Sequence, residues 1–524
     1  MYRHLLFSIL IFLFHKSHGQ DLHDNLEIEI KKNVDWYAGI LIEGHKMPLK
    51  NGYEAQLYGT SYYNQLQPLL LSTSGELVWS EEPFRFRVKK EKILFDKAYA
   101  PLEYKKAGKS LREAFLFASE NYFPPSGKMP PELFFSVPQY NTWIELTYNQ
   151  NQKDILEYAR AIIDNGMPPG IIMIDDNWQE DYGKWNFHPG RFPDPKAMMK
   201  ELKELGFKVM LWVCPFVSAD SDIYRELKKK RVFMLDERDK PAMVRWWNGV
   251  SALLDLTNPE SEKWFKGVLN NLITEFGVNG FKLDAGDGRF YNGLKSLKEV
   301  NPNTHTELFA KIGLSYPYNE YRATWKMGGQ PLVQRLHDKS HDWEDLKKLI
   351  PHMLLEGIMG YPFSCPDMIG GGQFTSFLDD APIDQELVVR STQVHALMPM
   401  MQFSVAPWRI LNGRHFNAVL DAVNLRNKFK ETILTLARKA SVNGEPIVRS
   451  MEYVFPHKGY VDITDQFMLG NNILVAPFLS KGEGSRKVIL PEGKWKSESG
   501  KIYKGGKTIT IDVPLTRLPY FIYQ

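Results

Sequence analysis

IIMIDDNW at residues 171–178, VNGFKLDAGD at 278–287 and LVQRLHD at 332–338 share one pattern. In each segment an apolar run with strand character ends in carboxylates, at the point where a β-strand gives way to a loop. In a (β/α)8 barrel the carboxyl ends of the strands meet at one face, where catalytic groups gather. Paired carboxylates on such a face are the groups that hydrolyse glycosides. The three segments therefore predict a barrel enzyme that acts on sugars.

Helical patterns alternate with these strands. In residues 154–165, Ile155, Ala159, Ile162 and Ile163 fall on one predicted apolar face. Asp194-Pro195 and Asn258-Pro259 are typical helix starts, with a capping side chain followed by proline. Repeated strand–helix units predict a parallel sheet covered by helices, and we place the first strand within TWIELTYN, residues 142–149. A doubly wound sheet is the alternative, but no glycine-rich nucleotide loop follows any predicted strand.

Two β-rich segments flank the barrel. A chain of 524 residues is too long for one core. Residues 20–129 predict an antiparallel β-domain with turns at Asn51-Gly52 and Ser74-Gly75, and residues 441–524 predict a β-sandwich. The barrel takes residues 130–440, which gives an α/β fold: a (β/α)8 TIM barrel between an N-terminal β-domain and a C-terminal β-sandwich.

Residues 1–19 have the layout of a cleavable secretory signal. Arg3 precedes an apolar run at 5–14, and Ser17 and Gly19 supply small residues before the expected cleavage point. The run is shorter than the ~20 residues that a membrane-spanning helix needs. We expect a secreted or periplasmic protein with no membrane span after signal removal; an uncleaved anchor is the alternative.

Charge and cysteine content exclude several classes of partner. The net charge is +3, with basic and acidic residues interleaved, so no basic block indicates nucleic-acid binding. Cys214 and Cys365 either form one bridge or remain free thiols. No histidine spacing or third and fourth ligand indicates a metal, and no cofactor is expected.

Asp284 is the strongest catalytic candidate. It ends the segment FKLD beside Gly286, and Lys282 could keep it ionised by opposing charge. Asp338 in RLHDKSHDW is the candidate general acid, which requires a raised pKa. Asp342 and His341 are nearby alternatives that spacing does not exclude. In a retaining pair the two carboxyl groups lie ~5–5.5 Å apart.

Further side chains are candidates for binding sugar. Asp175 and Asp176 are adjacent, so in a strand one faces the barrel axis and the other braces a loop. Asp367, in CPDMIGGG, either binds substrate or organises its turn. Tryptophans near strand ends could stack on sugar rings: Trp178, Trp212, Trp246 and Trp247.

These motifs, in this order, resemble glycoside hydrolase family 31. IDDNW, FKLDAGD, RLHDKSHDW, GYPFSCPDMIGG and DQFMLGNNILVAPF carry the resemblance over most of the chain after Pro130. VRWWNGVSALLDLTNP and PMMQFSVAPWR are similar to the branch of the myogenesis-regulating glycosidase and bacterial α-galactosidases. The resemblance implies that Asp284 is the nucleophile and Asp338 the acid/base. It also implies that Asp175 and Arg322 bind sugar hydroxyls and that Trp247 packs beside them.

One departure from the family bears on specificity. The α-glucosidases of the family carry an Arg and a His two residues apart in their last barrel strand, where this chain has Gln402 and Ser404. The departure favours a secreted retaining α-galactosidase acting on an oligosaccharide or glycoconjugate. The alternatives are an α-glucosidase, an α-xylosidase or a transglycosylase of the same family. A third hypothesis is a sugar-binding barrel without catalysis.

Overall fold

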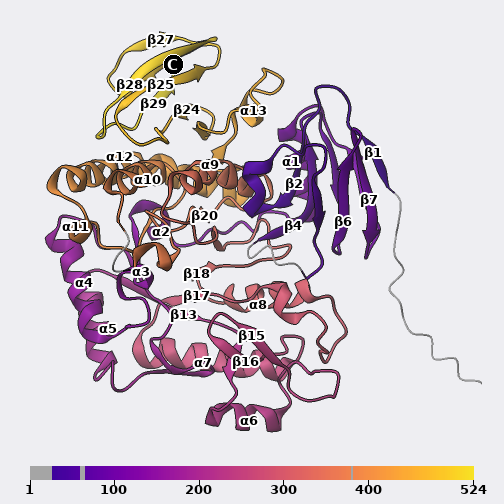
Figure 1. Cartoon of the computed structure of the whole chain (residues 1–524), viewed down its shortest axis with the longest axis vertical. Helices are drawn as coiled ribbons and strands as arrows, with labels where there is room; N and C mark the ends of the chain where they lie inside the picture. Colours follow the sequence, from indigo (N-terminus) through magenta and orange to yellow (C-terminus); the bar gives the residue numbers. More distant parts are fainter. Residues whose placement is uncertain (1–25, 60–64, 379–381) are drawn as a thin grey trace, which may run out of the picture.

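The computed structural model describes residues 26–59, 65–378 and 382–524, and a parallel barrel lies at its centre (Figure 1). Eight strands form one sheet in the order β20-β19-β18-β17-β13-β10-β9-β21. A parallel bridge between Met368 and Gln402 brings the two edges of this sheet together, so the barrel is nearly closed. The predicted (β/α)8 fold is confirmed. The strands are β9 (Gln139–Asn141), β10 (Ile171–Ile174), β13 (Lys208–Val213), β17 (Gly280–Leu283), β18 (Tyr318–Tyr321), β19 (Val333–Arg335), β20 (Ser364–Cys365) and β21 (Gln402–Phe403).

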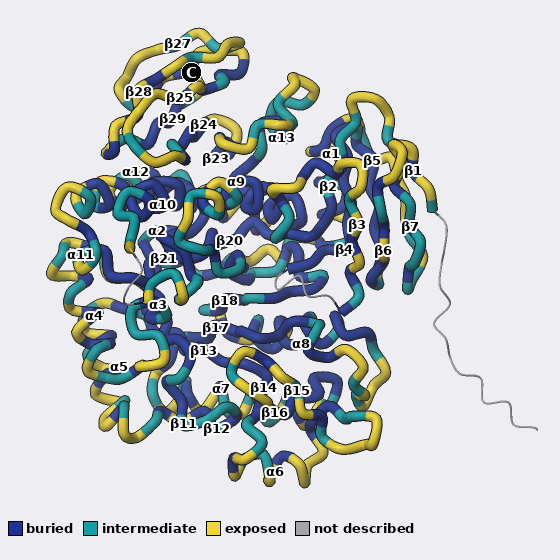
Figure 2. The backbone as a smooth tube through the Cα atoms, viewed as in Figure 1, coloured by how far each residue is buried: buried dark blue, intermediate teal, exposed yellow. Residues whose placement is uncertain are grey.

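Helices surround the strands, and their starts follow the predicted capping rules. Asp194 accepts a hydrogen bond from the Ala197 amide and Asn258 from that of Glu260, which fixes the first turns of α5 and α7. Figure 2 shows buried strands inside and exposed outer helix faces. The main helices are α4 (Gln152–Asp164), α5 (Pro195–Glu204), α7 (Pro259–Phe276), α8 (Pro302–Gly313), α9 (Trp343–Ile358), α10 (Gln385–Ala396) and α12 (Gly413–Asn443).

Two local predictions are wrong. The first barrel strand is β9, before the TWIELTYN segment, and Trp143–Leu146 is the short helix α3. A run this short does not distinguish a strand from a helix, and here Ile144 packs with Met368 of the loop after β20. On α4, Ile163 is 36% exposed whereas Ile155, Ala159 and Ile162 are buried. Ile163 therefore lies at the edge of the apolar face.

The N-terminal domain packs two antiparallel sheets against each other beside the barrel (Figure 1). Gln65, which precedes β4, reaches across and donates from Nε2 to the carbonyl oxygens of Arg322 (2.7 Å) and Arg335 (3.0 Å). The domain thus supports the barrel strands from which these arginines project. One sheet contains β1 (Glu27–Glu29), β7 (Lys92–Ala98), β6 (Phe84–Lys89) and β3 (Glu54–Gln56); the other contains β2 (Trp36–Ile40), β4 (Leu66–Ser72), β5 (Glu76–Trp79) and β8 (Glu103–Lys106).

The C-terminal domain is β-rich and follows α12. A buried cluster that includes Met468, Leu474, Val488 and Trp495 joins its two sheets. The larger sheet contains β22 (Val448–Arg449), β23 (Phe467–Leu469), β24 (Ile473–Val475), β29 (Tyr520–Tyr523), β26 (Lys494–Ser497) and β27 (Ile502–Lys504); β25 (Gly484–Leu490) pairs with β28 (Lys507–Val513).

The expected secretory signal lies outside the described residues. Within the ranges that the structure describes, no helix has the length and apolar character to cross a bilayer. The two cysteines, Cys214 and Cys365, are buried free thiols. The described part of the chain also holds no group of three or more His, Cys, Asp or Glu side chains that could bind a metal ion.

Candidate active site

A cavity of about 410 Å³ opens at the carboxyl ends of the barrel strands. It brings together most of the candidate site residues named from the sequence; Trp178, Trp246, His341, Asp342 and Asp367 lie outside its lining. These residues meet because β10, β13, β17, β18 and β19 are neighbours in one parallel sheet and end at the same edge. The lining residues are Trp143, Tyr148, Asp175, Asp176, Trp212, Trp247, Lys282, Asp284, Arg289, Arg322, Arg335, Asp338, Gln373 and Phe374.

Asp284 is fixed in place from both of its oxygens. Trp212 donates its indole N–H to Oδ2 over 2.8 Å, and the Ala285 amide donates to Oδ1 over the same distance. Arg322 Nε lies 3.6 Å from Oδ1. Ala285 has φ +57, which turns the chain sharply after β17 and aims the carboxylate into the cavity. These donors and the nearby cation favour an ionised, oriented carboxylate, as a nucleophile requires.

Lys282 is paired with a different carboxylate from the one expected. Its Nζ lies 2.6 Å from Asp175 Oδ2, and both side chains are buried. Burial disfavours the ammonium group, but the charges of Asp175 and Asp284 outweigh burial and raise the pKa of Lys282. Lys282 therefore supports Asp284 only at longer range, while it anchors Asp175 inside the barrel.

Asp176 also lines the cavity, and its carboxylate braces the surrounding loops. It accepts hydrogen bonds from Tyr182 Oη (3.1 Å) and Asn248 Nδ2 (2.6 Å). These partners adjoin the outer hairpins β11 (Gln179–Asp181)–β12 (Lys184–Phe187) and β15 (Met243–Trp246)–β16 (Gly249–Leu253). Burial and the charge of Asp175 raise the pKa of Asp176 to about 7. The adjacent carboxylates thus divide the two tasks as the strand alternation predicts.

Asp338 is the carboxylate of its segment that reaches the cavity. Asp342 instead caps α9 by accepting from the Asp345 amide, and His341 contacts the Gly370 carbonyl oxygen. Arg335 Nη1 donates to Asp338 Oδ1 over 2.8 Å. Burial raises the pKa of Asp338, but Arg335 and two further cations outweigh burial and lower it. The pKa of Asp338 is therefore lowered, and the raised pKa expected of a general acid is not found.

Asp367 does not line the cavity. It lies behind Arg335, and its Oδ1 accepts from Arg335 Nη1 over 2.6 Å. Its Oδ2 accepts from the Lys339 amide over 2.9 Å. The loop after β20 therefore presents this carboxylate to Arg335, and of the two roles predicted for Asp367 the geometry favours organising its loop.

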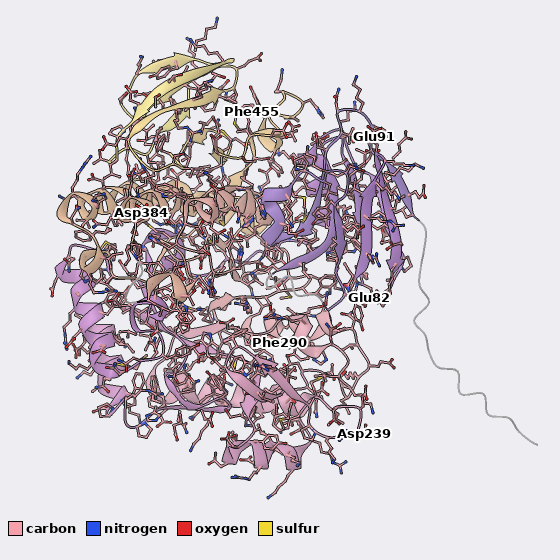
Figure 3. The ribbon with its side chains drawn as sticks, viewed as in Figure 1. Glu82, Glu91, Asp239, Phe290, Asp384 and Phe455 are labelled. Atoms are coloured by element: carbon pink, nitrogen blue, oxygen red, sulfur yellow. The ribbon has the colours of Figure 1, made fainter. Side chains whose placement is uncertain are left out.

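The candidate tryptophans divide into two groups. Trp247 is 42% exposed, and the Arg322 guanidinium lies 4.9 Å from its ring centroid. Phe290, labelled in Figure 3, lies 6.0 Å from the same ring. Trp212 also lines the cavity, where its indole N–H donates to Asp284. In contrast, Trp178 and Trp246 are core residues and lie outside the lining, so they are not stacking platforms.

Sequence reasoning missed an aromatic wall and two arginines of the cavity. The ring of Trp143 lies 5.3 Å from that of Tyr148 and 5.5 Å from that of Phe374. Trp143 and Tyr148 follow β9 whereas Phe374 follows β20, so no local pattern reveals the complete wall. Arg289 also lines the cavity. Arg335 lies three residues before Asp338 in the segment RLHD. This spacing is the signal that could have identified Arg335 as a site residue.

Comparisons with known proteins agree with this architecture. The model of the glycosyl hydrolases family 31 TIM-barrel domain matches residues 127–436, and that of the family's C-terminal domain matches 444–524. The solved Flavobacterium johnsoniae GH31 dextranase, complexed with glucose, superposes with a TM-score of 0.83. The match covers 95% of this chain and 66% of that one at 21% sequence identity, so it supports the fold alone.

Curated relatives extend the likeness in sequence. The myogenesis-regulating glycosidase of Mus musculus is 32% identical over 437 residues, which are 79% of this chain and 60% of the relative. Alpha-glucosidase 2 of Bacillus thermoamyloliquefaciens is 25% identical over 440 residues, 77% of this chain and 54% of the relative. The chain thus spans only part of the length of these relatives. With the matched barrel and C-terminal domains, these findings show that the chain belongs to glycoside hydrolase family 31.

Proposed function

We propose that this chain is a retaining α-glycosidase that removes terminal α-linked galactose. The observation that carries the proposal is the pairing of Asp284 and Asp338 in one cavity, each with its own set of donors. Family membership supports the reaction class. The proposed substrate is an oligosaccharide or glycoconjugate, and the reaction requires no cofactor.

The chemistry follows from the two environments. An Asp284 oxygen forms a bond to the anomeric carbon while the bond from that carbon to the leaving oxygen breaks, and Asp338 gives its proton to that oxygen. Water then attacks the glycosyl-enzyme, Asp338 takes the proton of the water, and Asp284 leaves as the carboxylate. Two inversions give net retention. Arg322, 3.6 Å from Asp284, is placed to bind a sugar hydroxyl or the returning carboxylate charge.

The choice of galactose rests on the last barrel strand. Gln402 donates to Glu320 over 2.8 Å, and Ser404 accepts from the Ile144 amide over 2.6 Å. Neither side chain lines the cavity, so the positions of the Arg and His of α-glucosidases provide no hydroxyl contact here. An α-glucoside or α-xyloside is the second candidate, because relatives of this chain are named alpha-glucosidase and alpha-xylosidase.

The test is hydrolysis of 4-nitrophenyl α-galactoside, α-glucoside and α-xyloside by the whole chain. We expect turnover of the galactoside with an α-configured first product, observed by NMR. Turnover of another glycoside alone would refute the galactose assignment but keep the reaction class. Saturable galactoside binding by calorimetry without product from activated or natural α-galactosides would refute catalysis and favour a sugar-binding barrel.

The proposed location is outside the cytoplasm, either secreted or periplasmic. The proposal rests on the signal-like residues 1–19. N-terminal sequencing of the exported protein tests it, and a mature chain that begins near Gln20 is the expected result. A mature chain that still begins at Met1 would refute it.

A further inference from the structure

Three carboxylates, two of them buried, surround the guanidinium group of Arg335. Its Nη1 donates to Asp338 Oδ1 (2.8 Å) and to Asp367 Oδ1 (2.6 Å), and its Nε lies 3.5 Å from Glu320 Oε1. The Arg335 side chain is 2% exposed, and those of Asp367 and Glu320 are at most 1% exposed. Of the three carboxylates, Asp338, 29% exposed, is the one that lines the cavity. One buried cation therefore has a single partner that can meet substrate and two that cannot.

A buried arginine paired with Asp338 alone would prevent catalysis. Protonating Asp338 would then leave the cation without a counter-charge in a low-dielectric site, which is strongly unfavourable. General acid catalysis nevertheless requires that protonated state. The charge that balances Arg335 while Asp338 holds a proton must come from elsewhere in the cluster.

The loop after β20 holds Asp367 where it supplies that charge. Asp367 adopts φ +83, a conformation that few residues other than glycine take up. A Cβ atom on Gly372 would lie 2.7 Å from Asp367 Oδ1 and 3.1 Å from Asp338 Oδ1. The glycine thus lets the backbone cover both carboxylates closely. Such local constraint is typical of functional sites.

We infer that Asp367 is a positioning residue that balances the charge of Arg335, so that Asp338 can alternate between its acid and carboxylate forms. The inference rests on the proposed glycosidase function and assigns to Asp367 a role without substrate contact. Other charged groups act on the cluster: Lys282, Asp284, Glu320, Arg322 and Lys339.

The electrostatics of Asp367 agree with this role. Burial raises its pKa, Arg335 opposes burial, and the charge of Asp338 adds to the rise, which gives a pKa of about 6. Above that pH Asp367 is ionised and weakens the hold of Arg335 on Asp338. Removing its charge should therefore lower the pKa of Asp338 further.

The test is Asp367→Asn, assayed against two galactosides that differ in leaving group. We expect kcat/KM to fall ~10–100-fold for methyl α-galactoside, which needs protonation, and only a few-fold for the 4-nitrophenyl glycoside. The basic limb of the pH profile should move down by about one pH unit, because Asp338 loses its proton more readily. Asp345→Asn is the matched control: Asp345 lies in the first turn of α9 and accepts from the Ser340 amide, with no hydrogen bond to Arg335.

A second variant keeps the inference testable if Asp367→Asn does not fold. Arg335→Gln removes the cation, so the basic limb should move to higher pH, opposite to the shift in Asp367→Asn. Equal losses on both substrates with an unchanged pH profile would overturn the role of Asp367. A wild-type chain inert towards every glycoside would overturn the proposed function itself, and with it this role.

Discussion

The two carboxylates of the cavity occupy opposite kinds of environment. Asp284 receives an indole N–H and a backbone N–H, with Arg322 at 3.6 Å. Asp338 has one strong partner, Arg335, which it shares with Asp367. The Asp284 side chain is 11% exposed and that of Asp338 is 29% exposed. One carboxylate is held by dedicated donors, and the other shares a cation.

The difference supports the proposed division of roles. A nucleophile must remain ionised and oriented, and fixed donors to both oxygens provide this. An acid/base must gain and lose a proton within one turnover, so its charge must be tunable by neighbours. Pairs of titratable groups with contrasting environments are the usual mark of such a division.

Asp284→Asn is expected to have the largest effect on activity. Without the nucleophile no glycosyl-enzyme can form, so we expect kcat/KM to fall at least ~10⁴-fold for any active glycoside. Asp287→Asn is the control, because Asp287 is also buried and pairs with Arg322 (3.3 Å) but does not line the cavity. Its loss should be far smaller. Measured rates of both folded variants test this prediction. Near-normal activity of Asp284→Asn would show that Asp284 is not the nucleophile.

Asp338→Ala should have the next largest effect, and the effect should depend on the leaving group. We expect ~10²–10⁴-fold loss on methyl α-galactoside and much less on an activated aryl galactoside. Added azide should restore turnover and give an α-galactosyl azide, since the small anion replaces base-assisted water. Asp342→Asn, which alters only the cap of α9, is the control. An equal loss on both substrates, without azide rescue, would assign Asp338 a structural role.

The sequence predicted the strand ends better than the partners across them. β10, β17 and β19 follow from apolar runs with strand character, and their carboxylates meet because parallel strands end together. Glu320 lies on β18 and Asp367 in the loop after β20, so the cluster around Arg335 follows from the adjacency of β18, β19 and β20 and from no local spacing. The direction of the Asp338 pKa was missed for the same reason. Residues 143–146 were misplaced because short apolar runs suit a strand or a helix equally.

Trp212→Phe removes one of the two hydrogen-bond donors to Asp284, and its expected effect is smaller. The indole N–H stabilises the Asp284 carboxylate, and it therefore assists the step in which that carboxylate leaves the glycosyl-enzyme. Losing a hydrogen bond to a charged group costs ~1.5–3 kcal/mol. If part of this energy is lost from the transition state of the second step, kcat falls about tenfold. KM for the aryl galactoside should fall with it, because the intermediate accumulates.

Trp178→Phe is the matched control for this change. Its indole N–H also donates over 2.8 Å, but to the Trp212 carbonyl oxygen in the core and not to Asp284. A pre-steady-state burst of nitrophenol that appears in Trp212→Phe and not in Trp178→Phe would show that the donor acts on the second step. A raised KM without a burst would place Trp212 in substrate binding, and the donors around Asp284 would then serve orientation alone.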